Sequence, residues 1–104
     1  MSYVKTYEDE ALSREAVAQR KGAWVLEFGA NWCGYCIAAQ KDIETVLAPL
    51  TEVGHEKIAD GPGRPLGRSY RVKLWPTLIL IRDGQEIDRV VRPTSAEQIR
   101  QLFP

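Results

Sequence analysis

Residues 24–36 read WVLEFGANWCGYC, and both cysteines of the 104-residue chain lie in this stretch. Its first seven residues are almost all apolar, which is typical of a central strand covered on both faces. Cys33 and Cys36 follow, three positions apart. We therefore predict a buried strand that delivers two thiols to the first turn of a helix.

The spacing of the two cysteines indicates redox chemistry. Two thiols on the first turn of a helix can close a small disulfide ring, and the orphan N–H groups and the dipole at a helix N-terminus favour a thiolate. A thiolate attacks a disulfide in a partner, and a second thiol resolves the mixed disulfide that forms. Between the cysteines, Gly34 lets a partner chain approach closely, and Tyr35 helps to set the redox poise of the pair.

Length and charge narrow the class of protein. A chain of 104 residues, 44% of them hydrophobic, is enough for one globular domain, residues 1–104, and too short for two. The 14 basic and 14 acidic side chains balance, which argues against a nucleic-acid binder, since such proteins carry a basic excess. No apolar run is long enough to span a membrane, and the N-terminus lacks the apolar segment of a secretory signal. We therefore expect no membrane association and a cytoplasmic location.

The cysteine and histidine counts also argue against a metal centre. Two cysteines in one motif cannot form a disulfide framework, and a structural zinc site usually needs four ligands. The single histidine, His55, is expected to be structural or solvent-facing. We expect no metal and no bound cofactor, because the dithiol is itself the redox group.

Around the central stretch, apolar periodicity and breaker residues predict alternating helices and strands. The elements expected before a loop at Asp60–Pro65 are a short edge strand over 4–7, a helix over 8–20, a strand over 24–30, a helix over 33–50 and a strand over 52–59. Those expected after it are a helix over 66–71, strands over 77–81 and 85–91 joined by a turn at Asp83-Gly84, and a C-terminal helix capped by Ser95 and Gln98. The early alternation predicts parallel pairing and the final hairpin an antiparallel pair, so the fold class is α/β.

The chain resembles the thioredoxin family over about residues 4–104. The resemblance rests on FGANWCGYC at residues 28–36 and on Trp75-Pro76-Thr77, which precedes an apolar strand and a glycine-containing hairpin. It implies the thioredoxin fold, a central mixed β-sheet of about five strands flanked by about four helices.

The resemblance also implies roles for individual residues. Cys33 matches the exposed attacking thiol, and Cys36 matches the buried resolving thiol. Pro76 matches a proline whose peptide bond is cis and which faces the disulfide. Glu27 falls where the family keeps a buried aspartate that helps to deprotonate the resolving cysteine, and Lys57 falls near the usual lysine partner of that carboxylate.

Five residues are expected to contact the partner chain. They lie within or beside the motif and before the second apolar strand: Trp32, Gly34, Tyr35, Trp75 and Pro76. Trp32 and Trp75 fit a core position as an alternative.

The chain departs from the family pattern at four places. Gly34-Tyr35 stands where thioredoxin has Gly-Pro, which alters the redox poise, and Glu27 is one methylene longer than the usual aspartate. Lys41 replaces a kinking proline. Trp75 replaces a smaller aliphatic residue and is expected to narrow or reshape the partner groove.

These features predict a protein disulfide reductase, a thioredoxin-like thiol–disulfide oxidoreductase that acts on disulfides in partner proteins through Cys33 and Cys36. The family implies electrons from a thioredoxin-reductase-type donor, and we expect the chain to act as a monomer. Two alternatives stay open. One is a disulfide oxidase or isomerase of an exported compartment, with which the Gly34-Tyr35 pair is compatible but against which the lack of a secretory signal argues, and the other is a non-enzymatic redox-sensing or binding module on the same fold.

One charged stretch flanks the expected partner groove. The cations Arg64, Arg68, Arg71 and Lys73 precede Trp75-Pro76. Such a stretch is usually a solvated face, and the alternative is that it attracts acidic partners.

Overall fold

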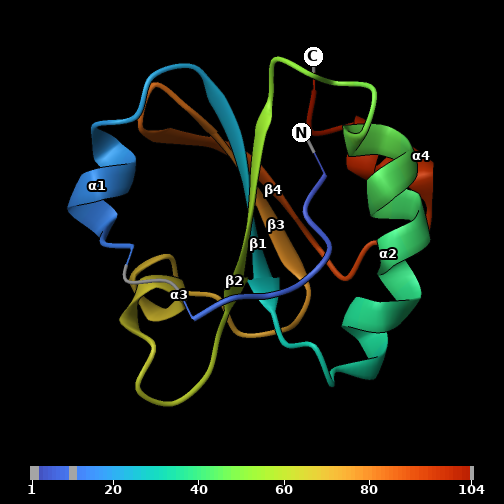
Figure 1. The fold of residues 1–104 in the computed structure, drawn as a ribbon, viewed down its shortest axis with the longest axis horizontal. Coiled ribbons are helices and arrows are strands. Elements are labelled where there is room, and N and C mark those ends of the chain that lie inside the picture. The colour runs from blue at the N-terminus through green and yellow to red at the C-terminus, as the bar shows by residue number, and fades with distance from the viewer. Residues whose placement is uncertain (1–2, 10–11, 104) are drawn as a thin grey trace.

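A four-stranded mixed sheet crosses the middle of the computed structural model, which describes residues 3–9 and 12–103 (Figure 1). The strands are β1 (Ala23–Gly29), β2 (Gly54–Ala59), β3 (Thr77–Arg82) and β4 (Gln85–Val91), in the spatial order β2-β1-β3-β4. β1 pairs in parallel with β2 and antiparallel with β3, and β3 pairs antiparallel with β4. The α/β class and the final hairpin predicted from the sequence are thus confirmed.

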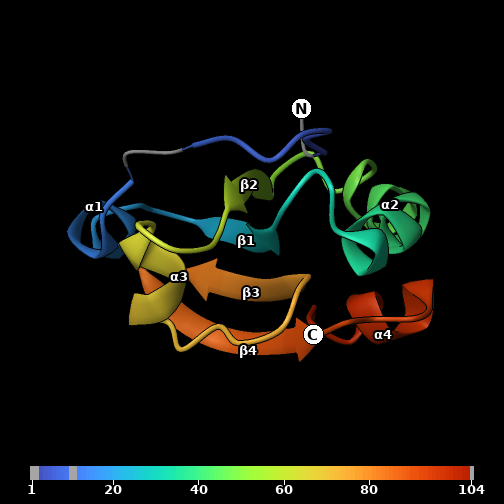
Figure 2. The ribbon, with the colours of Figure 1, turned by 90° about the horizontal axis from the view of Figure 1, so that it is seen from below.

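Helices cover both faces of this sheet. Figure 2 shows α1 (Arg14–Ala18) and α3 (Pro65–Ser69) on one side, and α2 (Gly34–Leu47) and α4 (Ala96–Arg100) on the other. The four strands and four helices of the described residues agree with the thioredoxin fold expected. A further parallel bridge, from Glu8 to Ile58, lies at the outer edge of β2.

The side-chain alternation of β1 divides the core in two. Leu26 and Phe28 pack in the cluster that includes Val17 of α1 and Leu66 of α3, whereas Val25 packs in the cluster that includes Ile43 of α2. Successive side chains of a strand point to opposite faces, so Glu27 lies on the same face as Val25. This alternation places the one carboxylate of β1 toward the helix that carries the cysteines.

The N-terminal elements differ from the sequence-based expectation. The helix expected over 8–20 is wrong in its start, because α1 begins at Arg14, where the Ser13 hydroxyl accepts a hydrogen bond from the Ala16 amide. Glu8 is extended instead, and its N–H and C=O groups both bond to the edge of β2, at 3.0 and 2.9 Å. The edge strand expected over 4–7 is therefore replaced by an isolated bridge at Glu8, and residues 10–11 lie outside the described residues.

The other boundaries shift by a few residues. α2 ends at Leu47 rather than at Leu50, because Pro49 cannot continue a helix. β2 begins at Gly54 rather than at residue 52, and α3 spans Pro65–Ser69 rather than 66–71. The C-terminal helix is capped as expected at Ser95, whose hydroxyl accepts from the Gln98 amide, but the Gln98 side chain bonds to the amide of Thr94.

The turn between β3 and β4 needs a glycine at its second position. Gly84 has φ +83°, and a Cβ there would lie 2.1 Å from the carbonyl oxygen of Ala18. Gly84→Ala is expected to lower the free energy of unfolding by at least about 2 kcal/mol, because it adds a strained backbone conformation to an overpacked contact. Urea denaturation measures this loss.

Gly63→Ala is the matched control for that variant. Gly63 has a similar φ of +78°, but nothing lies within 4 Å of the position of its Cβ. The free energy of unfolding of Gly63→Ala should therefore fall only by the cost of the strained backbone conformation, roughly 1 kcal/mol. If both variants lose the same free energy of unfolding, the close contact with Ala18 does not contribute to the loss in Gly84→Ala.

Candidate active site

Cys33 caps the helix that carries the cysteine pair. It has φ −77° and ψ 121°, outside the helical region, and its Sγ accepts a hydrogen bond from the Cys36 amide at 3.2 Å. This confirms the predicted position of the first thiol at the start of a helix. Both cysteines are free thiols.

The two thiols differ in exposure less than the family resemblance implied. Cys33 was expected to be exposed, but it keeps only 7% of its accessible surface, because it packs in one cluster with Ala30 and Trp75. Cys36 keeps 1%. Cys33 is still the more exposed of the two thiols.

Burial and the neighbouring Cys33 raise the pKa of the Cys36 thiol from its ordinary 9.0 to about 12. We therefore expect Cys36 to stay protonated at neutral pH in the reduced protein. In Cys33→Ser, where only Cys36 reacts, the rate of alkylation by iodoacetamide should keep rising well above pH 9. A plateau below pH 9 would contradict this expectation.

Two tryptophans form a wall beside the cysteines. The Trp75–Pro76 peptide bond is cis, as the family resemblance implied. Trp32 is 77% exposed and its ring meets Trp75 edge-on, with 5.6 Å between centroids. The indole N–H of Trp75 donates to the Asp60 carboxylate at 2.9 Å, which fixes the orientation of the ring. Trp75 is half-buried, and Trp32 is not a core residue.

Arg92 joins the two sides of the site, and sequence reasoning missed it. Its guanidinium lies 3.9 Å from the centre of the Tyr35 ring and donates to the Trp75 carbonyl at 2.8 Å. Its backbone N–H donates to the Pro76 carbonyl at 2.8 Å. Arg92 therefore links the residue between the cysteines to the cis-proline loop.

Glu27 lies at the centre of a buried hydrogen-bond network. Its carboxylate accepts from His55 Nε2 and from Gln40 Nε2, each at 2.9 Å, and from the Tyr7 hydroxyl. The carboxylate is fully buried. Burial opposes ionisation, but these hydrogen bonds and the charge of Lys57 keep the pKa of Glu27 below its ordinary value. The carboxylate is therefore an anion at neutral pH.

The hydrogen bonds of His55 define its tautomer. The Val4 amide donates to Nδ1 at 2.9 Å, so Nδ1 carries no proton. Nε2 then holds the proton and donates it to Glu27. The expectation that His55 is structural is confirmed, and the solvent-facing alternative is wrong, because the ring is buried between β2 and the N-terminal segment.

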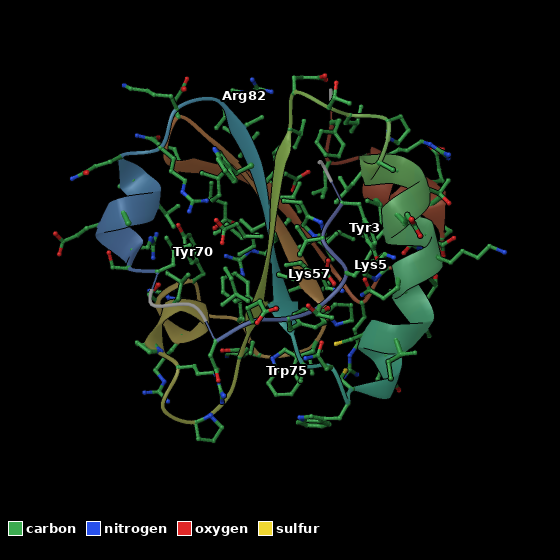
Figure 3. The ribbon with its side chains drawn as sticks, in the orientation of Figure 1. Tyr3, Lys5, Lys57, Tyr70, Trp75 and Arg82 are labelled. Atoms are coloured by element: carbon green, nitrogen blue, oxygen red, sulfur yellow. The ribbon has the colours of Figure 1, made fainter. Side chains whose placement is uncertain are left out.

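Lys57 lies beside this carboxylate, as the resemblance implied. Its Nζ is 4.0 Å from Glu27 Oε2 and donates at 2.6 Å both to Gln40 Oε1 and to the Lys5 carbonyl. Figure 3 shows Lys57 next to the N-terminal segment and near Tyr3. Burial lowers the pKa of Lys57, while the Glu27 charge opposes that shift.

The partners of Glu27 leave only a weak trace in the sequence. In the parallel register of β1 and β2, Val25 lies opposite His55 and Glu27 opposite Lys57. His55 and Lys57 are two residues apart and therefore share a face, and Gln40 lies one helical turn after Cys36. The alternation of β2 was a usable signal, whereas the edge strand expected over 4–7 gave no indication that Tyr7 would reach Glu27.

No cluster of three or more potential ligands that could hold a metal ion occurs among the described residues.

A thioredoxin family model matches residues 4–103. The chain belongs to the thioredoxin family.

Several thioredoxins are similar to this chain in sequence and structure. Thioredoxin of Chlamydia caviae is 39% identical over 84 residues, which is 79% of this chain and 80% of that protein. Thioredoxin of Echinococcus granulosus is 31% identical over 100 residues, 96% of this chain and 91% of its own. The solved structure of reduced thioredoxin 2 from Pseudomonas aeruginosa PAO1 is 48% identical, with a TM-score of 0.85, and the alignment covers 95% of this chain and 92% of that one.

Membership of the thioredoxin family settles the type of reaction. This thioredoxin-family chain is a thiol–disulfide oxidoreductase that reduces disulfides in partner proteins through the Cys33 and Cys36 pair. Across residues 3–9 and 12–103, none of the helices has the length and apolar character needed to cross a membrane.

Proposed function

We propose that Cys33 attacks the partner disulfide and that Cys36 resolves the product. The observation that carries this assignment is the position of Cys33 at the N-terminus of α2, with more exposure than Cys36 one turn deeper. A thiolate at such a terminus is favoured by the N–H groups and the helix dipole.

Two successive exchanges complete the reaction. The Cys33 thiolate attacks one sulfur of the partner disulfide, a Cys33–partner S–S bond forms, and the other partner sulfur leaves as a thiolate that takes up a proton. Cys36 then loses its proton and attacks Cys33, so that the Cys33–Cys36 bond forms and the second partner sulfur leaves. Two electrons pass from the cysteine pair to the partner, and each partner sulfur leaves as a thiolate that takes up a proton from solvent.

Glu27 serves as the acceptor for the proton of Cys36 in this proposal. It is ionised, fully buried and on the same face of the sheet as α2. Lys57, 4.0 Å from the carboxylate, supports the anion until the proton arrives.

The partner chain lies across the wall of aromatic residues and the cis-proline. Trp32 and Tyr35 are 77% and 62% exposed, and no heavy atom lies within 4 Å of the position of a Gly34 Cβ. This open surface leaves room for a peptide backbone between Gly34 and Trp75-Pro76. Exposed aromatic rings are suited to such contacts, because they combine apolar area with a polar group.

The same reaction fits a reducing cellular compartment. The cysteine pair serves as the redox group without a cofactor, and a thioredoxin-reductase-type donor returns electrons to it. The chain works as a monomer in the cytoplasm, where thiols are kept reduced and a disulfide reductase can be recharged.

Cys36→Ser tests the assignment of attack and resolution. With the resolving thiol removed, a mixed disulfide between Cys33 and a partner protein is expected to accumulate in nearly stoichiometric amount. Mass spectrometry of an acid-quenched reaction with insulin measures it, and Cys33→Ser is the control that should trap nothing. A mixed disulfide on Cys36 in the control would reverse the assignment.

A further inference from the structure

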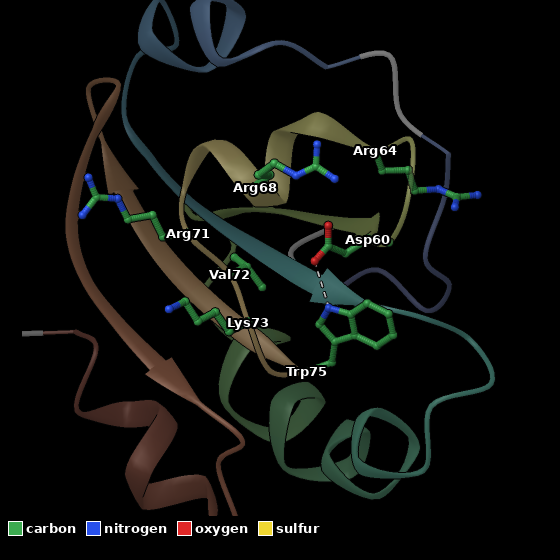
Figure 4. Close-up of a pocket in the computed structure, with 8 residues that line it drawn as sticks. Asp60, Arg64, Arg68, Arg71, Val72, Lys73 and Trp75 are labelled. Carbon is green, nitrogen blue, oxygen red and sulfur yellow. Dashed lines mark hydrogen bonds between the residues drawn. The ribbon is translucent and has the colours of Figure 1, made fainter.

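A cleft of about 400 Å³ opens beside Trp75 (Figure 4). Its lining includes four cations, Arg64, Arg68, Arg71 and Lys73, and the single carboxylate Asp60. Over residues 61–75 the sequence has these four cations and no acidic residue, although the whole chain has no net charge. Positive charge is therefore concentrated beside Trp75, one of the two tryptophans next to the cysteines.

The charged groups of this cleft divide into engaged and free ones. Arg64 pairs with Asp9 at 2.6 Å, and Asp60 accepts from the Trp75 indole at 2.9 Å. By contrast, the side chains of Arg68, Arg71 and Lys73 are exposed and form no ion pair or hydrogen bond within the described residues. Three cations are thus available to an external anion.

The position of the cleft relative to Trp75 indicates what could occupy it. Trp75 packs on one side against the cluster that contains Cys33 and Cys36. Trp75 also lines the cleft, and the side chains of Arg71 and Lys73 extend away from its indole ring (Figure 4). Trp75 therefore belongs both to the surroundings of the cysteines and to the lining of the cationic cleft.

We propose that the cleft formed by Arg68, Arg71, Lys73 and Trp75 binds an acidic segment that flanks the reactive disulfide of the partner protein. This inference rests on the proposed function, since it extends the substrate surface of the same site. Complementary charges of this kind act mainly on the rate of encounter and on the choice of partner.

Three disulfide-bridged peptides test the proposal. They share one core and carry flanks of Asp and Glu, of Ser and Gln, or of Lys. At low salt the acidic peptide should be reduced with a kcat/KM about tenfold above the neutral one, and the basic peptide should be slower than both. The preference should largely disappear near 1 M salt, where the Debye length is about 3 Å.

Two triple variants locate the effect on the surface. Arg68→Gln/Arg71→Gln/Lys73→Gln should reduce the preference for the acidic peptide to about one. Lys21→Gln/Arg82→Gln/Arg100→Gln removes the same charge from exposed positions elsewhere and should keep the preference. An acidic peptide reduced no faster than the neutral one, or equal losses in both variants, would overturn the cleft proposal. Failure to reduce any peptide would overturn the proposed function instead.

A second feature, independent of the cleft, is the position of Tyr7 between Glu27 and Cys36. Its hydroxyl donates to Glu27 Oε2. The hydroxyl oxygen and Cys36 Sγ also converge over Gly29, where a Cβ would lie 2.8 Å from the former and 2.6 Å from the latter. Only a glycine leaves this space, and the tyrosine hydroxyl and the thiol lie on its border.

Other contacts hold Tyr7 in this position. Asn31, next to the cysteine motif, accepts from the Tyr7 amide at 2.9 Å and donates to the Tyr7 carbonyl at 3.1 Å. The Lys57 ammonium lies 4.4 Å from the centre of the ring. Burial and the Glu27 charge raise the pKa of Tyr7 above its ordinary value, so the hydroxyl stays protonated.

We propose that the Tyr7 hydroxyl carries the Cys36 proton to Glu27 during resolution. The Cys36 S–H proton passes to the Tyr7 oxygen as the Tyr7 proton passes to Glu27 Oε2. Tyr7 is left neutral, Glu27 becomes a carboxylic acid, and the Cys36 thiolate attacks Cys33. This step also rests on the proposed function, since it assumes that Cys36 is the resolving thiol.

Tyr7→Phe removes the hydroxyl and keeps the ring. Resolution should slow by roughly a hundredfold, as for other lost proton-transfer groups, and the Cys33–partner mixed disulfide should accumulate during turnover. The first attack, followed in the Cys36→Ser background, should keep its rate.

Tyr3→Phe is the matched control for Tyr7→Phe. The Tyr3 hydroxyl donates at 2.8 Å to Gln40 in the same network, and within the described residues no hydrogen bond joins it to Cys36. Its resolution rate should stay near that of the wild type. The rate of resolution as a function of pH provides a further test. The titratable groups around Tyr7 are Glu27, His55, Lys57 and both cysteines. Of the two tyrosine variants, only Tyr7→Phe should change this pH profile. An unchanged profile, or equal slowing in both variants, would overturn the relay.

Discussion

Cys33→Ser is expected to lower the rate of insulin disulfide reduction by at least about a thousandfold, to the uncatalysed level. A serine hydroxyl does not ionise at neutral pH and cannot replace the thiolate. The remaining thiol cannot take over the attack either, because Cys36 is only 1% exposed and burial raises its pKa to about 12. Turnover of insulin with a chemical reductant measures the loss.

The fold should survive this substitution. Cys33 is the N-cap of α2, and serine is among the preferred N-cap residues, so the midpoint of urea denaturation should change little. A variant that reduces insulin at near wild-type rate would show that Cys33 is not the nucleophile. If Cys33→Ser is unfolded, its loss of activity reflects the lost structure and not the missing thiolate. Activity and denaturation midpoint of Cys33→Ala then separate these two causes.

Glu27→Leu is expected to have the largest effect on stability. It removes the acceptor of two buried donors and one partly buried donor, and the counter-charge of Lys57, which itself has only 2% of its surface exposed. Breaking a buried pair in this way costs about 3–5 kcal/mol, which lowers Tm by roughly 15 °C or more. Thermal unfolding followed by circular dichroism measures the shift.

The loss of stability in Glu27→Leu should become smaller at acidic pH. The pKa of Glu27 is lower in the folded state than its ordinary value of 4.5. Its contribution to stability is therefore fully present above pH 4.5 and is lost as the pH falls through the folded pKa. The difference in stability between wild type and Glu27→Leu should narrow below pH 4.5, and a gap that widens there would contradict the assignment of an ionised carboxylate.

Glu27→Leu/Lys57→Met is the matched control. Replacing both charges by apolar groups removes the unpaired buried ammonium, so the double variant should be more stable than Glu27→Leu alone. If it is less stable, the ion pair is not the cause of the loss.

The sequence was sufficient for the features that depend on local chemistry. Cys33 and Cys36 belong to one helical turn. The apolar run before them is a local pattern that indicates a strand buried on both faces. The turn at Asp83-Gly84 and β4 at Gln85–Val91 were likewise predictable, because a tight turn and a period of two are properties of adjacent residues.

Tertiary structure alone decided the surroundings of the thiols. Glu27 was recognisable as an unusual carboxylate, but its bonds to His55 and Gln40 depend on the register of β1 with β2 and on how α2 packs over the sheet. Tyr7 reaches the site because Glu8 pairs with the edge of β2 instead of starting a helix. These contacts join residues 13 to 28 positions apart, and no local period encodes them. Helix and strand propensities act over a few residues, whereas a buried charge is satisfied by whichever donors packing brings to it.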